Sequence, residues 1–444
     1  MGDVLEKRIE YSGHLTDELT SGKEHGSRAR GSGNQKETGF YLYEARLRKG
    51  LSLEEAAKGI CSISYLSKIE KLEVAFDEGN KKHRLLKERL EVGESENDGN
   101  WLSKYHQQIW FKDGDKLKAS IGKMQDGYRQ RLLLLSLYVV LDLLGKASGL
   151  INYFYKIESY LSVSELQLLY FCLSCYFVGY GQSQYLLYSL RMARYFRLQD
   201  PLLHLQMAKY AFKTGADLHS FHFLERADRL FKGLEANISH IDCQLLKCQE
   251  LLNRHFLQPA GHILNIISHI IDQFPPNQKA AYFLTQGLYH QVQGKSKEAE
   301  SAFNHSLSLA KNTNRPIFEM SLIHLAAMYS RLKKEKLLEK LLHHESLDYS
   351  QLKKSTVHRL QFYKELLKPP AKNPNLKMLL HYQAIPQALD EHDKKSLTDY
   401  ANTMIDYYES QGQYKKATQL WHQVQEFESH VKTFQISLSA YFQI

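Results

Sequence analysis

Small residues recur along this 444-residue chain at a fixed interval, and this recurrence constrains the fold more than any other feature. Three small positions return further along the chain, all displaced by the same distance: Ser174, Gly181 and Ala193 correspond to Ala208, Gly215 and Ala227. Small residues allow two antiparallel helices to cross closely, and a glycine can end the first helix at the turn. We therefore expect an all-α chain of stacked helical hairpins.

The interval of about 34 residues matches the tetratricopeptide repeat, whose helix pairs stack into a right-handed α-solenoid. Two further groups of residues fit the same template: Gly287, Gly294, Ala299 and Phe303, then Tyr408, Gly412, Tyr414, Ala417 and Trp421. The pattern predicts helix pairs near residues 124–159, 163–197, 201–233, 239–273, 277–311, 316–345, 349–384 and 394–430. The repeats are thus expected to fill residues 124–444.

A second pattern, between residues 46 and 70, predicts two short helices joined by a tight turn. Ser52 can cap a helix whose third residue is Glu55, because each side chain can satisfy a backbone N–H of the other residue. A second helix starts near Ser62 and turns Leu66 and Ile69 to the same side. Its outer residues are small hydroxyls, one ring and one cation, which suit the DNA major groove. The alternative is a helical hairpin with no role in DNA binding.

Residues 40–92 resemble the Xre-type helix-turn-helix family of the lambda repressor and Cro, and within it the PlcR-like regulators. The likeness lies in Leu51–Cys61, which runs without a gap into a helix ending Ser67–Glu70. The resemblance implies a structural ion pair between Arg46 and Glu70. It also places the DNA-contacting residues on the second short helix: Ser62, Ile63, Ser64, Tyr65, Ser67 and Lys68.

Composition divides the remaining chain into segments. Residues 1–38 are polar, with Gly and Ser scattered through them, which predicts a disordered N-terminal arm. A lambda-repressor-like DNA-binding domain is expected over residues 39–92. The stretch at 91–100 is acidic and contains glycine, so residues 93–123 are expected to form a linker and a linker helix before the repeats.

Charge and cysteine content restrict the possible functions. A formal net charge of +9 suits a polyanionic partner. Five cysteines, an odd number, indicate reduced thiols in the cytoplasm. Cys172 and Cys175 have zinc or redox spacing but lack a second pair, so we expect core packing, no metal site and no cofactor. The sequence has neither a phosphate-binding loop nor a nucleophile elbow, so no enzyme is expected. The apolar run at 132–144 is too short to span a membrane.

The inward positions of the first repeat helices carry side chains that suit an extended peptide. Amides can bond the peptide backbone through a donor and an acceptor, and cations can hold a carboxylate. The candidate peptide-binding residues are Lys209, Lys213, Gln249, Asn253, Gln291, Arg331, Asn402 and Asp406. For each of these residues the alternative is a solvated helix face.

An Xre-type head followed by a tetratricopeptide body resembles the peptide-pheromone regulators of Gram-positive bacteria, the group of Rap, NprR, PlcR, Rgg and PrgX proteins. The resemblance implies a cytoplasmic homodimer that regulates transcription by binding double-stranded DNA and senses a short signalling peptide in quorum sensing. The alternative is a repeat scaffold that binds a protein partner such as a response regulator, as Rap-type members do. The two hypotheses differ in whether Ser64, Tyr65 and Lys68 matter for function.

Overall fold

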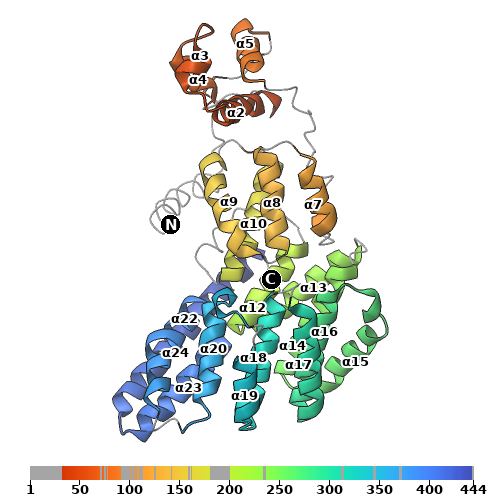
Figure 1. Ribbon diagram of the computed structural model, residues 1–444, viewed down its shortest axis with the longest axis vertical. Helices are drawn as coiled ribbons and strands as arrows, with labels where there is room; N and C mark the ends of the chain where they lie inside the picture. Colours follow the sequence, from red (N-terminus) through yellow and green to blue (C-terminus); the bar gives the residue numbers. More distant parts are fainter. Residues whose placement is uncertain are drawn as a thin grey trace. The chain divides into compact units, whose positions relative to one another are not determined.

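The computed structural model is built from α-helices with short 3₁₀ and π segments over the residues that it describes (Figure 1). These are residues 33–442 apart from 92–101, 181–200 and shorter gaps within 71–78 and 103–113 and at 125–126, 142, 159–160, 162, 234–236, 312–314, 344–346 and 370–372. The predicted arm up to residue 32 and the second helix of the pair at 163–197 lie outside the described residues.

Contacts divide the chain into two compact units. Unit 1 comprises the described parts of residues 1–107, 115–138 and 145–172, and unit 2 comprises residues 108–114, 139–144 and 173–444. Most of the first predicted helix pair, at 124–159, therefore groups with residues 1–107, whereas the sequence pattern assigned it to the repeat domain. The two units are described separately below.

Four helices form the N-terminal head of unit 1: α2 (Gly33–Arg48), α3 (Leu53–Ala57), α4 (Ile63–Glu70) and α5 (Lys81–Leu90). The expected capping box is present. The Glu55 N–H donates to the Ser52 hydroxyl at 3.1 Å, and the Ser52 N–H donates to the Glu55 carboxylate at 2.7 Å. Gly59 has a φ of +75° in the turn between α3 and α4, a conformation that glycine adopts without strain.

Apolar residues from all four helices form one small core beneath this motif. They are Leu42, Ala45, Ala56, Ala57, Leu66, Ile69, Leu86 and Leu90. Leu66 and Ile69 thus point inward from α4, as their spacing predicted. Helix α2 begins at Gly33, before the expected start of the domain at residue 39.

The rest of unit 1 is helical too. It contains α7 (Gly114–Gly122), α8 (Tyr128–Val140), α9 (Leu144–Ile157) and the part of α10 (Val163–Tyr180) up to Cys172. Helices α8 and α9 correspond to the predicted pair at 124–159. Helix α7 lies in the segment for which a linker helix was expected.

Four helical hairpins begin unit 2. Their helices are α12 (Pro201–Thr214), α13 (Asp217–Gly233), α14 (Asn237–Asn253), α15 (Leu257–Ser268), α16 (Pro276–Val292), α17 (Ser296–Ala310), α18 (Arg315–Arg331) and α19 (Glu335–Leu342). Within a hairpin the two helices cross closely. A Cβ atom added at Gly287 of α16 would lie 2.5 Å from the Phe303 ring of α17, so this crossing requires glycine.

The turn of each of these hairpins contains one residue with positive φ, as does the turn before α24. These residues are Gly215, His255, Gly294, Lys333 and Gly412. The first four are evenly spaced but further apart than the predicted interval, which therefore does not continue through unit 2. The physical reason is helix length: α14, α16 and α18 each have 17 residues, against 14 in α12.

The C-terminal part of unit 2 contains η3 (Tyr349–Gln351), α20 (Lys354–Glu365), α21 (Pro374–Leu379), the π segment η5 (Leu380–Ala384), α22 (Ile385–Asp390), α23 (Lys394–Ser410) and α24 (Tyr414–Phe442). The predicted pair at 349–384 is therefore not a simple hairpin. Pro386 follows the π segment and has no N–H to donate to the preceding turn, which accounts for the local widening.

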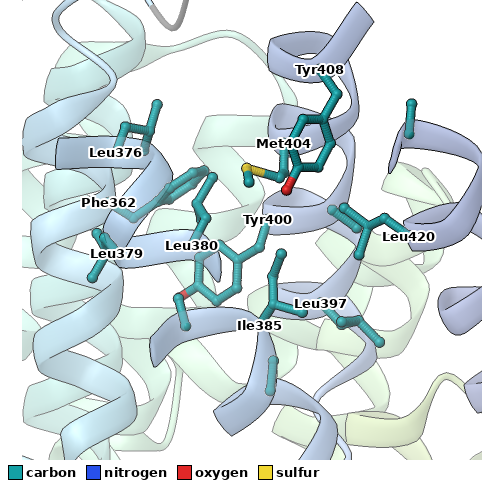
Figure 2. Close-up of a cluster of buried hydrophobic side chains, with 14 of the residues drawn as sticks. Phe362, Leu376, Leu379, Leu380, Ile385, Leu397, Tyr400, Met404, Tyr408 and Leu420 are labelled. Carbon is teal, nitrogen blue, oxygen red and sulfur yellow. The ribbon is translucent and has the colours of Figure 1, made fainter. Parts of the chain in front are cut away.

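The core of this region gathers around two aromatic rings. Phe362 of α20 and Tyr400 of α23 pack edge to face, with ring centroids 4.9 Å apart. Buried aliphatic residues from α21, η5, α22 and α24 surround them (Figure 2). This packing fixes α20 and α23 next to each other.

The first hairpin of unit 2 also contacts its last helices. The Tyr210 hydroxyl of α12 lies 2.9 Å from Nδ1 of His392, and Nζ of Lys213 lies 3.6 Å from Glu391. His392 has a φ of +52° between α22 and α23. These contacts join the N-terminal and C-terminal ends of the repeat array within unit 2.

The cysteines are all free, and Cys172 and Cys175 are buried. Among the described residues there is no group of three or more His, Cys, Asp or Glu side chains that could hold a metal ion. In the same part of the chain, every helix is too short or too polar to cross a membrane.

Candidate nucleic-acid interface and repeat surface

Helix α4 has one buried face and one exposed face. Leu66, Ile69 and Glu70 are buried, and the hydroxyl of Ser62 accepts the Tyr65 N–H at 3.2 Å in the first turn. The six predicted DNA-contacting residues lie on the remaining surface: Ser62, Ile63, Ser64 and Lys68 are exposed, and Tyr65 and Ser67 are half-buried. Ile63 exposes 46% of its surface, which makes it available for apolar contact with a thymine methyl group.

Tyr65 also has a partner within the protein. Its hydroxyl lies 3.0 Å from Nε2 of His83 on α5, and the two rings stack with centroids 5.8 Å apart. Nδ1 of His83 lies 2.7 Å from the backbone nitrogen of Asp77 and 3.1 Å from its carbonyl oxygen, so both ring nitrogens have a polar partner. Burial lowers the pKa of His83 below its ordinary value of 6.5. Tyr65 therefore fixes α4 to α5 as well as forming part of the outer surface.

Arg46 and Glu70 form a bidentate ion pair between α2 and α4. Nε of Arg46 lies 2.7 Å from one Glu70 oxygen, and a terminal nitrogen of Arg46 lies 2.8 Å from the other. A second terminal nitrogen donates to the Leu51 carbonyl at 3.0 Å. Arg46 is 7% exposed and Glu70 4%, and the hydrogen bond to Glu70 is the main cause of the raised Arg46 pKa. This pair connects the last turn of α4 to α2 and to the chain after it.

The candidate peptide-binding residues fall into registers relative to the positive-φ turns. Lys213, Asn253 and Arg331 each lie two residues before such a turn residue. Lys209, Gln249 and Asp406 each lie six residues before one. Because the turns are equivalent points of the hairpins, residues in one register occupy equivalent places on their helices, and on α16 these places hold Val292 and Leu288. Gln291 and Asn402 lie outside these two registers.

The surroundings of these candidates differ. Asn253, Arg331, Asn402 and Asp406 are exposed, and Lys209 and Gln291 are half-buried. The Gln249 amide donates to the Thr285 hydroxyl of α16 at 3.0 Å. Lys213 pairs with Glu391, and burial is the main cause of its lowered pKa. Gln249 and Lys213 thus hold parts of unit 2 together.

Sequence reasoning missed His83 and the long-range partner of Lys213. His83 and Tyr65 lie on different helices, and Glu391 is separated from Lys213 by most of the repeat array, so helical spacing gives no indication of either contact. The only sequence signal for His83 is its place among Leu86 and Leu90 on one face of α5, where a polar residue requires a partner.

Comparison with known proteins bears on the fold. No model of a known protein family matches the sequence, and no curated protein matches it. A Rap protein complexed with Competence and Sporulation Factor is similar with a TM-score of 0.56 and 12% identity, over 75% of this chain and 98% of that one. NprR in complex with its cognate peptide NprX is similar with a TM-score of 0.54 and 16% identity, over 73% of this chain and 99% of that one. The all-α architecture is therefore shared with these two proteins.

Proposed function

We propose that this chain is a sequence-specific transcriptional regulator that binds DNA through α4 and senses a short signalling peptide on its repeats. The observation that carries DNA binding is the division of α4 into a face fixed by the core and a face of short hydroxyls with one cation. A helix presented in this way has the width and the donors to read base edges in the major groove. We place this regulator in the cytoplasm, as a homodimer whose two α4 helices read two half-sites.

Peptide sensing is supported by the shared registers on the repeat helices. Amide and cationic side chains at equivalent places of α12 and α14, with Arg331 in the same register on α18, suit a ligand that presents backbone groups along the array. The two structures of similar fold add support, because NprR was solved with its cognate peptide and the Rap protein with Competence and Sporulation Factor.

The test is to select bound fragments from the host genome with the full-length protein, with and without short peptides encoded beside the gene. Lys68→Ala should weaken binding of the selected fragment by about 1–3 kcal/mol if Lys68 reads a base edge. If Lys68 holds only phosphate, the loss should be equal for all sequences and the salt dependence shallower. Lys415→Ala, which removes an exposed cation from α24, is the matched control and should bind as the wild type does.

Failure to enrich any fragment would overturn the DNA-binding proposal. A response regulator or other protein partner bound by the repeats, with no effect of Ser64→Ala or Lys68→Ala, would instead establish the scaffold alternative. Selection that is unchanged by every peptide, together with no peptide binding in calorimetry, would overturn peptide sensing and leave DNA binding intact.

A further inference from the structure

The first helices of the hairpins in unit 2, together with α20, form a closed series. Contacts run from α12 to α14, then to α16, α18 and α20, and α23 contacts α12. The edge-to-face pair of Phe362 and Tyr400 completes the series between α20 and α23. First helices line the concave face of a tetratricopeptide stack, so helices surround this face on all sides.

Some of the joins in this series are apolar. Leu284 of α16 belongs to one buried cluster with Leu322 and Leu325 of α18. The same cluster includes Leu360 of α20. Separating these helices would expose buried apolar surface to water, which is unfavourable. The joins between α16, α18 and α20 should therefore stay closed.

The join between α12 and the turn that follows α22 contains polar bonds that water can replace. The Tyr210 hydroxyl lies 2.9 Å from Nδ1 of His392, and Nζ of Lys213 lies 3.6 Å from a carboxylate oxygen of Glu391. The side chains of Lys213 and Glu391 are each 28% exposed, so water reaches both. Such bonds are exchanged for bonds to water when the groups separate, so each contributes little net stability.

The turn at this join is strained and borders open space. His392 has a φ of +52°, which is unfavourable for a residue with a side chain. Its neighbours Glu391 and Asp393 line a pocket of about 200 Å³ that is open to solvent. On the wall of this pocket, Nδ1 of His358 is buried and has no hydrogen-bond partner among the residues that the structure describes. The turn can therefore move into the pocket without displacing a packed core.

The closed join is nevertheless a defined fit. A Cβ atom added at Gly215, which follows α12, would lie 2.6 Å from Cδ of Lys394. Nζ of Lys394 lies 3.2 Å from a carboxylate oxygen of Glu428 on α24. The ring of His392 packs edge to face with Phe427 of α24, with centroids 5.8 Å apart. The turn is thus fixed to α24 on one side and to α12 on the other.

We propose that the join between α12 and the turn at residues 391–394 is a latch that opens to widen the concave face for a ligand. While the join holds, α12 and α23 fix the width of this face. When it opens, Tyr210 and Lys213 separate from the turn, and His392 can leave its strained conformation. The inference rests on the proposed peptide sensing and specifies how the peptide reaches the repeats.

Hydrogen exchange of the full-length protein without ligand tests the opening. Tyr210→Phe removes the hydroxyl, Glu391→Gln removes the charge that faces Lys213, and the two changes are made singly and together. Each single change should speed exchange of the Gly215 and His392 amides roughly two- to tenfold, which corresponds to the net value of one hydrogen bond. The amides of α16 and α17 should exchange as in the wild type. The single variants decide the question if the double variant does not fold.

Peptide kinetics test whether the latch controls entry. The association rate of a labelled peptide encoded beside the gene is measured by stopped-flow anisotropy. It should rise in the latch variants by about the same factor as the exchange, because only the open fraction admits the peptide. Tyr414→Phe combined with Glu409→Gln is the matched control, since both residues are exposed and lie at the far end of α23 from the turn. The control should change neither rate.

Three results would contradict the inference in different ways. Exchange at Gly215 and His392 that stays at the wild-type rate in the latch variants would show that the join is not a latch. Faster exchange with an unchanged association rate would overturn control of entry while peptide sensing stands. Binding of no peptide by the wild type or by any variant would overturn peptide sensing and the admission of a peptide with it.

Discussion

Glu44 of α2 accepts a hydrogen bond from the backbone N–H of Tyr128, 3.2 Å away, at the first residue of α8. The same carboxylate accepts a hydrogen bond from the hydroxyl of Tyr153 on α9. The Tyr128 hydroxyl donates in turn to the buried carboxylate of Glu165 on α10, at 2.9 Å. Within unit 1, these bonds connect α2 to α8 and α9 directly, and to α10 through Tyr128. A shift of α8 or α9 would therefore break these hydrogen bonds or move α2 with it.

The first prediction tests this connection. Glu44→Ala should destabilise unit 1 by about 1–3 kcal/mol, because the buried N–H of Tyr128 loses the Glu44 acceptor. Glu44→Gln should recover part of this loss, since an amide oxygen still accepts. Hydrogen exchange of the Tyr128 amide is the measurement, and Glu54→Ala, at an exposed site on α3, is the control. Unchanged exchange in Glu44→Ala would show that the contact contributes nothing.

The second prediction concerns the ion pair between Arg46 and Glu70. Glu70→Ala would leave a buried cation without its carboxylate and should cost up to roughly 3–5 kcal/mol. The amide hydrogens of α2 to α5 should then exchange at a lower temperature than in the wild type, while those of α16 and α17 in unit 2 stay protected. Glu73→Ala removes an exposed carboxylate just after α4 and serves as the control. Equal protection in both variants would mean that the pair adds no stability.

The third prediction is a pH dependence from His83. Burial lowers its folded-state pKa below 6.5, so the unfolded chain binds the proton more readily than the folded one. The contribution of His83 is therefore fully present above about pH 6.5 and is lost as the pH falls through the lower folded-state value. Helices α2 to α5 should therefore unfold more easily at pH 5.5 than at pH 7.5. His83→Gln should flatten this difference, and an unaltered pH profile in that variant would contradict the assignment.

Local features of the chain were predictable from sequence because they depend on near neighbours. The capping box of Ser52 and Glu55, the inward direction of Leu66 and Ile69 and the turns at Gly215, Gly294 and Gly412 all follow from spacing or backbone freedom. The turns at His255 and Lys333 have positive φ without glycine, so no residue type marked them. Because His255 and Lys333 could not be recognised as turn residues from the sequence, the longer interval between the turns of unit 2 was not predicted.

The polar clusters of the candidate sites depend on tertiary packing and could not be predicted in this way. Arg359 of α20 is an example, because its ion-pair partners Asp393 and Asp399 lie at the start of α23 and on it, more than thirty residues further along the chain. Sequence reasoning selected Arg331 because it lies at an inward position of a first repeat helix. It gave no reason to select Arg359, because α20 does not belong to a simple hairpin with a positive-φ turn of its own.

The last prediction separates ligand contact from architecture at two amides of α14. Asn253 is exposed, whereas the Gln249 amide already donates to Thr285 of α16. Asn253→Ala should therefore weaken peptide binding, because a backbone group of the peptide loses its partner, and it should leave the melting temperature of unit 2 unchanged. Gln249→Ala should lower stability by about 0.5–1.5 kcal/mol, the usual net value of one hydrogen bond. Calorimetry with the peptide and thermal unfolding without it measure the two effects. Loss of stability in Asn253→Ala, or equal peptide affinity in wild type and Asn253→Ala, would remove Asn253 from the peptide-binding surface.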